Sequence, residues 1–181
     1  MRLPSDSALL VIDAERVISD PRNGPIVAAA IGLLVQAWRK ESLPVAHLRR
    51  GSAELNLPPR AYIPEAQPKP GEPLIAMDAA DAFAGGALEA WLEGLGATTL
   101  VVCGFGDPDP VETTLDAAAA RGYRMFVVGE ACAAPLHAMP LETARVVTLQ
   151  TALQASALAQ VRRRLKARAE GPGKQEKTTE S

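Results

Sequence analysis

Acidic side chains follow two apolar segments of the sequence, and they are the residues best suited to chemistry. Asp13 ends the run ALLVID and Glu15 comes two residues later, while Asp107 and Asp109 follow the run TTLVVC. Both runs are typical of buried strands, and ligands of open α/β sheets bind beyond the carboxyl ends of the strands. A carboxylate in that position can act as a general base, and several together can bind Mg²⁺ or Ca²⁺.

The same acidic residues also have ordinary structural interpretations. Asp109 can cap the start of a helix, Asp107 can be a solvated turn residue, and Asp13 can cap a neighbouring backbone turn. Because the structural roles of Asp107 and Asp109 are far commoner than a cation site, we expect no metal here. His47 ends another predicted strand, and no further ligands follow it at metal-binding spacing, so we expect no metal there either.

The sequence contains two cysteines, and neither has the surroundings of a nucleophile. Cys103 lies inside or at the very end of an apolar strand, and Cys132 follows another apolar run without an identifiable base beside it. Cysteine ligands of metals usually occur in closely spaced pairs, which are missing here. We therefore expect both thiols to be reduced core residues and not a disulfide or a metal pair.

A second interpretation of the same region comes from its glycines. Gly104 and Gly106 follow a strand, and Glu130 ends the next one, which is a partial signature of a dinucleotide or adenosyl cofactor site. The third glycine of that signature is absent, and Asp107 and Asp109 would repel a pyrophosphate at the helix start. We keep this interpretation as an alternative, and we expect no cofactor.

Apolar runs alternate with helical patterns along most of the chain. Such alternation predicts a parallel sheet covered by helices on both faces. We therefore predict one α/β domain over residues 5–169, a three-layer αβα sandwich with a mostly parallel six-stranded sheet, and a disordered polar tail at 170–181. The predicted strands are 8–13, 43–48, 74–77, 98–103, 123–128 and 146–149, and the predicted helices are 26–40, 82–95, 109–121 and 150–168.

The stretch from Thr98 to Ala134 predicts a strand, a helix and a second, parallel strand. Asp109 is a plausible N-cap of that helix, Pro110 fits its first position, and Glu112 completes a capping box. Two connections depart from regular alternation. The proline-rich segment 58–73 predicts neither strand nor helix, and the last crossover is too short for a full helix.

Charge and hydropathy exclude some classes of partner. The chain has 181 residues, 48% of them hydrophobic, and a net charge of −2, so it lacks the basic surface of a general nucleic-acid binder. The basic run VRRRLKAR near the end is most simply a solvated helix end. No apolar run reaches the length needed to span a membrane and the first residues do not resemble a signal peptide, so we expect a cytoplasmic protein.

Three segments carry a resemblance to a known family. They are Asp13-Ala14-Glu15-Arg16-Val17-Ile18, Met77-Asp78-Ala79-Ala80-Asp81-Ala82-Phe83, and the run from Gly104 to Thr114 followed by Gly122-Tyr123. In order and spacing they resemble the landmarks of the isochorismatase-like cysteine hydrolases, a family that includes nicotinamidases, carbamoyl-amide hydrolases and isochorismatases. The resemblance extends from Ala8 to about Leu158 and implies the same three-layer fold.

In that family an Asp acts as general base, a Lys stabilises charge and a Cys attacks an amide-type carbonyl. The resemblance places Asp13 at the Asp position, Met77 at the Lys position and Pro110 at the Cys position. Proline carries neither a nucleophile nor an N–H for an oxyanion hole. We therefore expect a family member that has lost cysteine hydrolase activity and either binds a small molecule or acts as a non-catalytic partner.

The alternative is a divergent hydrolase of amide, carbamoyl or vinyl-ether substrates that uses Asp13. The resemblance also implies a homo-oligomer, a dimer or larger, and a cis peptide between Phe105 and Gly106. The residues expected to contact a ligand are Glu15, Phe83, Phe105, Gly106, Asp107, Asp109 and Thr114.

Overall fold

Six parallel strands form one sheet in the order β3-β2-β1-β4-β5-β6. The computed structural model describes residues 6–14, 24–50, 63–77, 81–104, 108–133 and 144–170. From the central β1–β4 pair, the sheet extends through β2 and β3 on one side and through β5 and β6 on the other, as in doubly wound folds. This strand order confirms the predicted α/β class. The strands are β1 (Ser7–Ile12), β2 (Val45–Arg50), β3 (Leu74–Met77), β4 (Thr99–Gly104), β5 (Arg124–Cys132) and β6 (Ala144–Val147).

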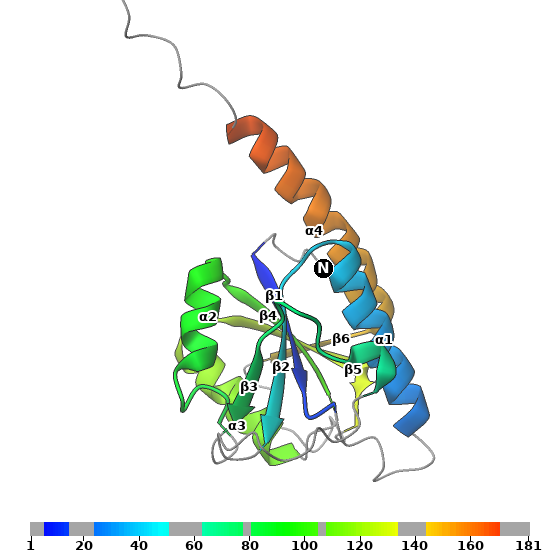
Figure 1. Ribbon diagram of the computed structural model, residues 1–181, viewed down its shortest axis with the longest axis vertical. Helices are drawn as coiled ribbons and strands as arrows, with labels where there is room; N and C mark the ends of the chain where they lie inside the picture. Colours follow the sequence, from blue (N-terminus) through cyan, green and yellow to red (C-terminus); the bar gives the residue numbers. More distant parts are fainter. Residues whose placement is uncertain are drawn as a thin grey trace, which may run out of the picture.

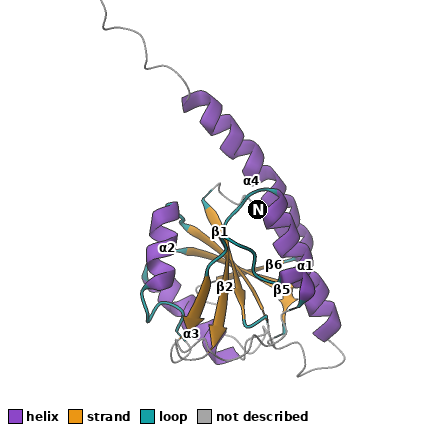
Figure 2. Cartoon of the chain, viewed as in Figure 1, coloured by secondary structure: helices purple, strands orange, loops and turns teal. Residues whose placement is uncertain are grey.

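Helices cover both faces of the sheet, which gives the three layers in Figure 1. Helices α1 (Gly24–Lys40) and α4 (Leu149–Glu170) lie on one face, and α2 (Ala87–Leu95) and α3 (Pro108–Ala120) lie on the other. Successive strand residues point to opposite faces, so the alternate residues of each strand enter two separate hydrophobic clusters. Figure 2 shows the strands as one central layer between these helices.

Several boundaries differ from the sequence-based prediction. Helix α2 begins at Ala87 and not at residue 82, because an Asx turn with a 2.9 Å bond from the Phe83 N–H to Asp81 comes first, and the left-handed Gly86 precedes the helix. Helix α3 begins at Pro108, so Asp109 is a residue of the first turn and not its N-cap. Both Pro108 and Pro110 fit there because the first-turn N–H groups have no intrahelical acceptor.

Other departures concern the connections. The proline-rich segment contains a short 3₁₀ helix, η1 (Pro64–Ala66), where Pro64 sets the backbone and Ala66 N–H donates to Ile63 O at 2.9 Å. Strand β5 continues to Cys132, four residues beyond the prediction, across a shift in its register with β4. The short last link, 134–143, and the tail after Glu170 lie outside the described residues. None of the described helices is long and apolar enough to cross a bilayer.

A network of charged groups ties the long β2–β3 connection to the body of the protein. Arg39 of α1 donates two hydrogen bonds to Glu72, from Nε to Oε1 at 2.7 Å and from Nη2 to Oε2 at 2.8 Å. His47 of β2 lies 2.8 Å from the same carboxylate, and the Lys69 N–H donates to it at 3.0 Å. Because Glu72 stands just before β3, these bonds hold the start of β3 against α1 and β2.

The network shifts the pKa values of both His47 and Glu72. Burial lowers the pKa of His47 from 6.5 and outweighs the opposing effect of Glu72, so the imidazole is neutral in the folded chain at neutral pH. Burial by itself raises the pKa of Glu72, but the hydrogen bonds from Arg39, Lys69 and His47 outweigh it and lower that pKa to about 2.

One glycine allows β1 and β4 to approach closely. Gly104 has φ = +151°, and a Cβ built on it would lie 1.9 Å from the carbonyl oxygen of Ile12, its partner in the ladder. No real Cβ tolerates that distance, and the obstacle is backbone, which cannot rotate away. The last rung of the central strand pair therefore requires a residue without a side chain.

Replacement of Gly104 by alanine should destabilise the fold strongly. We expect Gly104→Ala to lower the free energy of unfolding by about 3 kcal/mol or more, because both the clash and the backbone conformation oppose it. The matched control is Gly94→Ala in α2, where a Cβ meets nothing within 4 Å. It should stabilise by about 0.5–1 kcal/mol. Urea denaturation measures both, and equal stability of the two variants would contradict this account.

Acid should weaken the fold in two steps. The unfolded chain binds a proton at His47 that the folded chain does not, so stability falls as pH drops below about 6.5. A second loss follows below pH 4.5 and continues toward pH 2, as Glu72 becomes protonated. Thermal unfolding at pH 7.5, 6 and 5 should show the first step in the native chain and a reduced step in His47→Gln. A step of the same size in both would assign it to another group.

Candidate functional site

Asp13 lies directly beyond the end of β1, at the edge of the sheet where the strands end, called here the carboxyl edge. Its side chain is buried, with 5% of the residue exposed, and its backbone takes the left-handed conformation with φ = 49°. Aspartate tolerates that conformation better than most residues do. The Asp13 N–H donates to Leu48 O at 2.8 Å, so the residue is held by the β1–β2 ladder.

That hydrogen bond places Arg49 beside Asp13. In this ladder a β1 residue pairs with the β2 residue that follows its hydrogen-bond acceptor: the Leu9 N–H donates to Pro44 O, and Leu9 pairs with Val45. The bond from the Asp13 N–H to Leu48 O therefore pairs Asp13 with Arg49. Arg49 is also buried, with 9% of the residue exposed. Two residues of opposite charge thus occupy neighbouring register positions at the carboxyl edge. Arg49 was not among the site residues predicted from the sequence.

Met77 and Phe83 belong to the hydrophobic core of the α2/α3 face. Met77 is 2% exposed and packs in that cluster, so the position compared with the family lysine carries no charge. The Phe83 ring lies 6.0 Å from the ring of Tyr123 and 4.7 Å from the guanidinium carbon of Arg121. Those two residues follow the far end of α3, so the structure places Phe83 with them and not with the start of that helix.

The first turn of α3 brings Asp109 and Pro110 to the carboxyl edge, because the helix follows β4 there. Thr114 lies on the buried side of α3, and its Oγ1 has no hydrogen-bond partner among the described residues. The other predicted ligand contacts, Glu15, Phe105, Gly106 and Asp107, lie outside the described residues, as does the peptide predicted to be cis.

Both thiols are unsuited to nucleophilic attack. Cys103 is a buried residue of β4, and burial raises its pKa well above the usual value. Cys132, the last residue of β5, is opposite Gly104, and burial raises its pKa to about 12 against the smaller opposing effect of a hydrogen bond with the Gly104 backbone. Both are free cysteines. Since the thiolate is the reactive form, neither has the surroundings of an activated nucleophile.

Two further predicted features have structural roles. His47 is hydrogen bonded to Glu72 at the end of the β2–β3 connection, and Glu130 accepts a 3.0 Å hydrogen bond from the N–H of Leu149, the first residue of α4. Glu130 therefore caps a helix. In the part of the chain that the structure describes, no three His, Cys, Asp or Glu side chains lie close enough to hold a metal ion.

The comparison with known families decides the relationship. Residues 7–155 match the model of the isochorismatase domain, from β1 to the first turns of α4. The chain belongs to the isochorismatase family. The match confirms the resemblance seen in the sequence.

Solved structures of isochorismatase-family proteins agree with that assignment. A protein from Chromobacterium violaceum shares 31% identity over 87% of this chain and 97% of its own, with a TM-score of 0.75. An isochorismatase from Pseudomonas putida shares 26% identity over 83% and 92%, with a TM-score of 0.73. A family protein from Burkholderia thailandensis, at 22% identity over 86% and 98% with a TM-score of 0.72, shows the shared fold.

The state of the two thiols gives a direct test of this site. Treatment of the native protein with a thiol-reactive disulfide reagent at pH 7.5 should label both cysteines at least about 100-fold more slowly than the unfolded chain, since burial suppresses the thiolate. Absorbance of the released thiol measures the rate, and the Cys132→Ala variant assigns it. Rapid labelling of Cys132 in the native protein would show an activated thiol and contradict the pKa argument.

Proposed function

We propose that this isochorismatase-family chain binds a small molecule at the carboxyl edge without cysteine-based hydrolysis. The observation that carries the proposal is the state of its two thiols, the only ones in the sequence. Cys103 is buried in β4, Cys132 is partly buried at the end of β5, and desolvation raises the pKa of both. Neither belongs to α3, the helix whose N-terminal dipole would favour a thiolate.

Two replacements support the same conclusion. Pro110 lies in the first turn of α3, at the position that resembles the family nucleophile, and it removes a sulfur and an N–H donor together. Met77 replaces the family's lysine with an apolar side chain buried in the core. Asp13 is the retained member of the set, and its burial next to Arg49 gives the edge a polar pair suited to ligand binding.

A second candidate function, a divergent hydrolase that uses Asp13, is favoured by Arg49. A guanidinium carries a permanent positive charge and up to five N–H donors, so it can stabilise a developing oxyanion as a lysine would. In such a reaction Asp13 would deprotonate a water, and the arginine would lie on its neighbouring strand. This function needs no thiol.

A substrate screen separates these functions. The purified chain is incubated with panels of amides, carbamoyl compounds and vinyl ethers, and ligand binding is followed in parallel by thermal shift. We expect no turnover, and we expect at least one compound to raise the melting temperature of the native protein. Asp13→Asn should abolish that shift, because the carboxylate is the retained polar group of the site.

The control variants make each outcome decisive. Turnover that persists in Cys132→Ala and is lost in both Asp13→Asn and Arg49→Gln would establish the divergent hydrolase. Turnover that is lost in Cys132→Ala would overturn both functions and restore a cysteine mechanism. A thermal shift of the same size in Asp13→Asn would place the ligand elsewhere on the chain.

A further inference from the structure

A pocket of about 530 Å³ lies at the opposite edge of the sheet, where the strands begin. Its lining comes from the end of α1, the turn before β2, the segment before β3 and the last turns of α2. A volume of this size lies within the range of small-molecule sites. The pocket is separated from Asp13 by the length of the strands, so it is a different place from the site proposed above.

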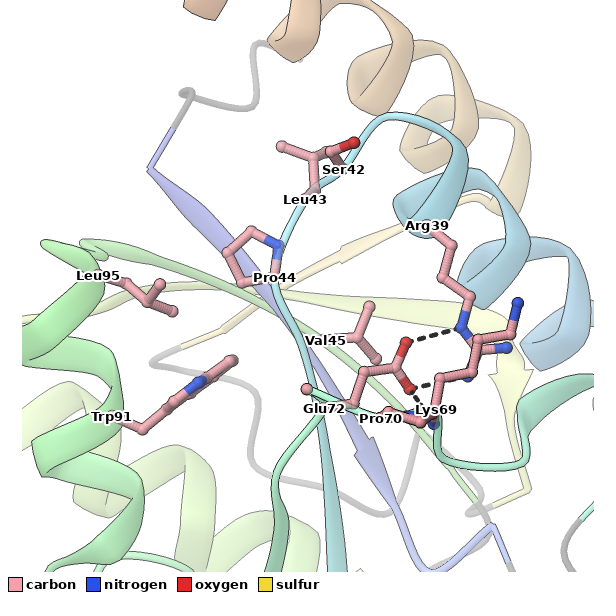
Figure 3. A pocket seen from close by; sticks show the side chains of 11 residues that line it. Arg39, Ser42, Leu43, Pro44, Val45, Lys69, Pro70, Glu72, Trp91 and Leu95 are labelled. Atoms are coloured by element: carbon pink, nitrogen blue, oxygen red, sulfur yellow. Dashed lines mark hydrogen bonds and ion pairs between the residues drawn. The ribbon is translucent and has the colours of Figure 1, made fainter.

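The two sides of the pocket differ in character. Figure 3 shows Trp91 and Leu95 of α2 on one side and the Arg39–Glu72 pair on the other, with Pro44 and Val45 between them. Leu95 is 42% exposed, and Trp91 is half-buried. The α2 side therefore offers an aromatic ring and an aliphatic side chain that solvent reaches.

The charged side carries a net positive charge. Its titratable groups are Arg39, Lys69 and Glu72, which sum to +1. The Glu72 carboxylate already accepts hydrogen bonds from Arg39 and from the Lys69 N–H and contacts His47, and its pKa of about 2 keeps it ionised. Its acceptor capacity is thus engaged within the protein. Among the described residues that line the pocket, the second cation is Lys69, an exposed residue of the rim.

We propose that this pocket binds a small amphipathic anion, a flat apolar body with one carboxylate. The apolar body would pack against Trp91 and Leu95, and the carboxylate would pair with the Lys69 ammonium. A cationic ligand would meet the net positive charge of the wall, and a polar neutral one would leave the α2 side unused. Ligand binding in this pocket does not depend on any reaction at the carboxyl edge.

The two tryptophans of the chain supply a reporter with an internal control. Trp91 lines the pocket, whereas Trp38 is fully buried in the core on the other face. Titration with naphthoate, followed by the two indole N–H resonances, should shift the Trp91 signal saturably and leave that of Trp38 unchanged. Naphthamide, which has the same rings without the charge, should bind more weakly.

Charge-removing variants test the role assigned to Lys69. Lys69→Gln should weaken naphthoate binding about fivefold and leave naphthamide binding unchanged, as expected for a partly exposed ion pair. The matched control is Lys40→Gln, an exposed lysine at the end of α1 outside the pocket, which should change the affinity less than twofold. Equal effects of the two variants, tighter binding of naphthamide, or an unmoved Trp91 signal would overturn the proposal. Each readout is independent of Asp13 and of turnover.

Discussion

The close contact between β1 and β4 is the constraint on which the rest of the structure depends. These two central strands pair from Ser7 to Ile12, and the last rung sets the Ile12 carbonyl against the α-carbon of Gly104. The sheet extends from this pair in opposite directions, through β2 and β3 on one side and through β5 and β6 on the other. An open α/β sheet forms its ligand-binding crevice at such a pair. Asp13 and the start of α3 follow directly from the two strands, so the position of both depends on a residue that has no side chain.

Charged residues with little exposure lie at both edges of the sheet. At the carboxyl edge Asp13 and Arg49 stand on adjacent strands. At the other edge Glu72 joins α1, β2 and the start of β3 through Arg39 and His47. Removal of Arg39 would leave the Glu72 carboxylate without its ion-pair partner, which costs more than the intact pair contributes. The Glu72 contacts thus join α1, β2 and the start of β3.

The chain shares the sheet and helix arrangement of isochorismatase-family proteins. The strand order, the start of α3 after β4 and Asp13 are present, while an apolar side chain and an imino acid occupy the positions that resemble the family's lysine and cysteine. The two proposed sites lie at opposite edges of the sheet. One depends on Asp13 and its neighbouring strand, and the other on α2 and the β2–β3 connection, so changes in one need not affect the other.

Local patterns predicted most of the elements. Strand β3 matches its predicted range, and α1 and α4 differ from theirs by two residues or fewer at each end, because apolar periodicity is a property of neighbouring residues. The predicted start of α2 was wrong by five residues, since a hydrogen bond from the Phe83 N–H to the Asp81 side chain and two glycines override the apolar pattern there. The N-cap assigned to Asp109 was wrong for a related reason, because Pro108 can also begin a helix.

The sequence by itself determined the fold class, the alternation of strands and helices, the buried state of Cys103 and the family. Only the tertiary structure decided that Arg49 neighbours Asp13, that Phe83 packs against Arg121 and Tyr123, and that a pocket forms between Trp91 and the Arg39–Glu72 pair. The physical reason is that strand register and the packing of helices on a sheet join residues far apart in the chain, and no local pattern encodes those distances.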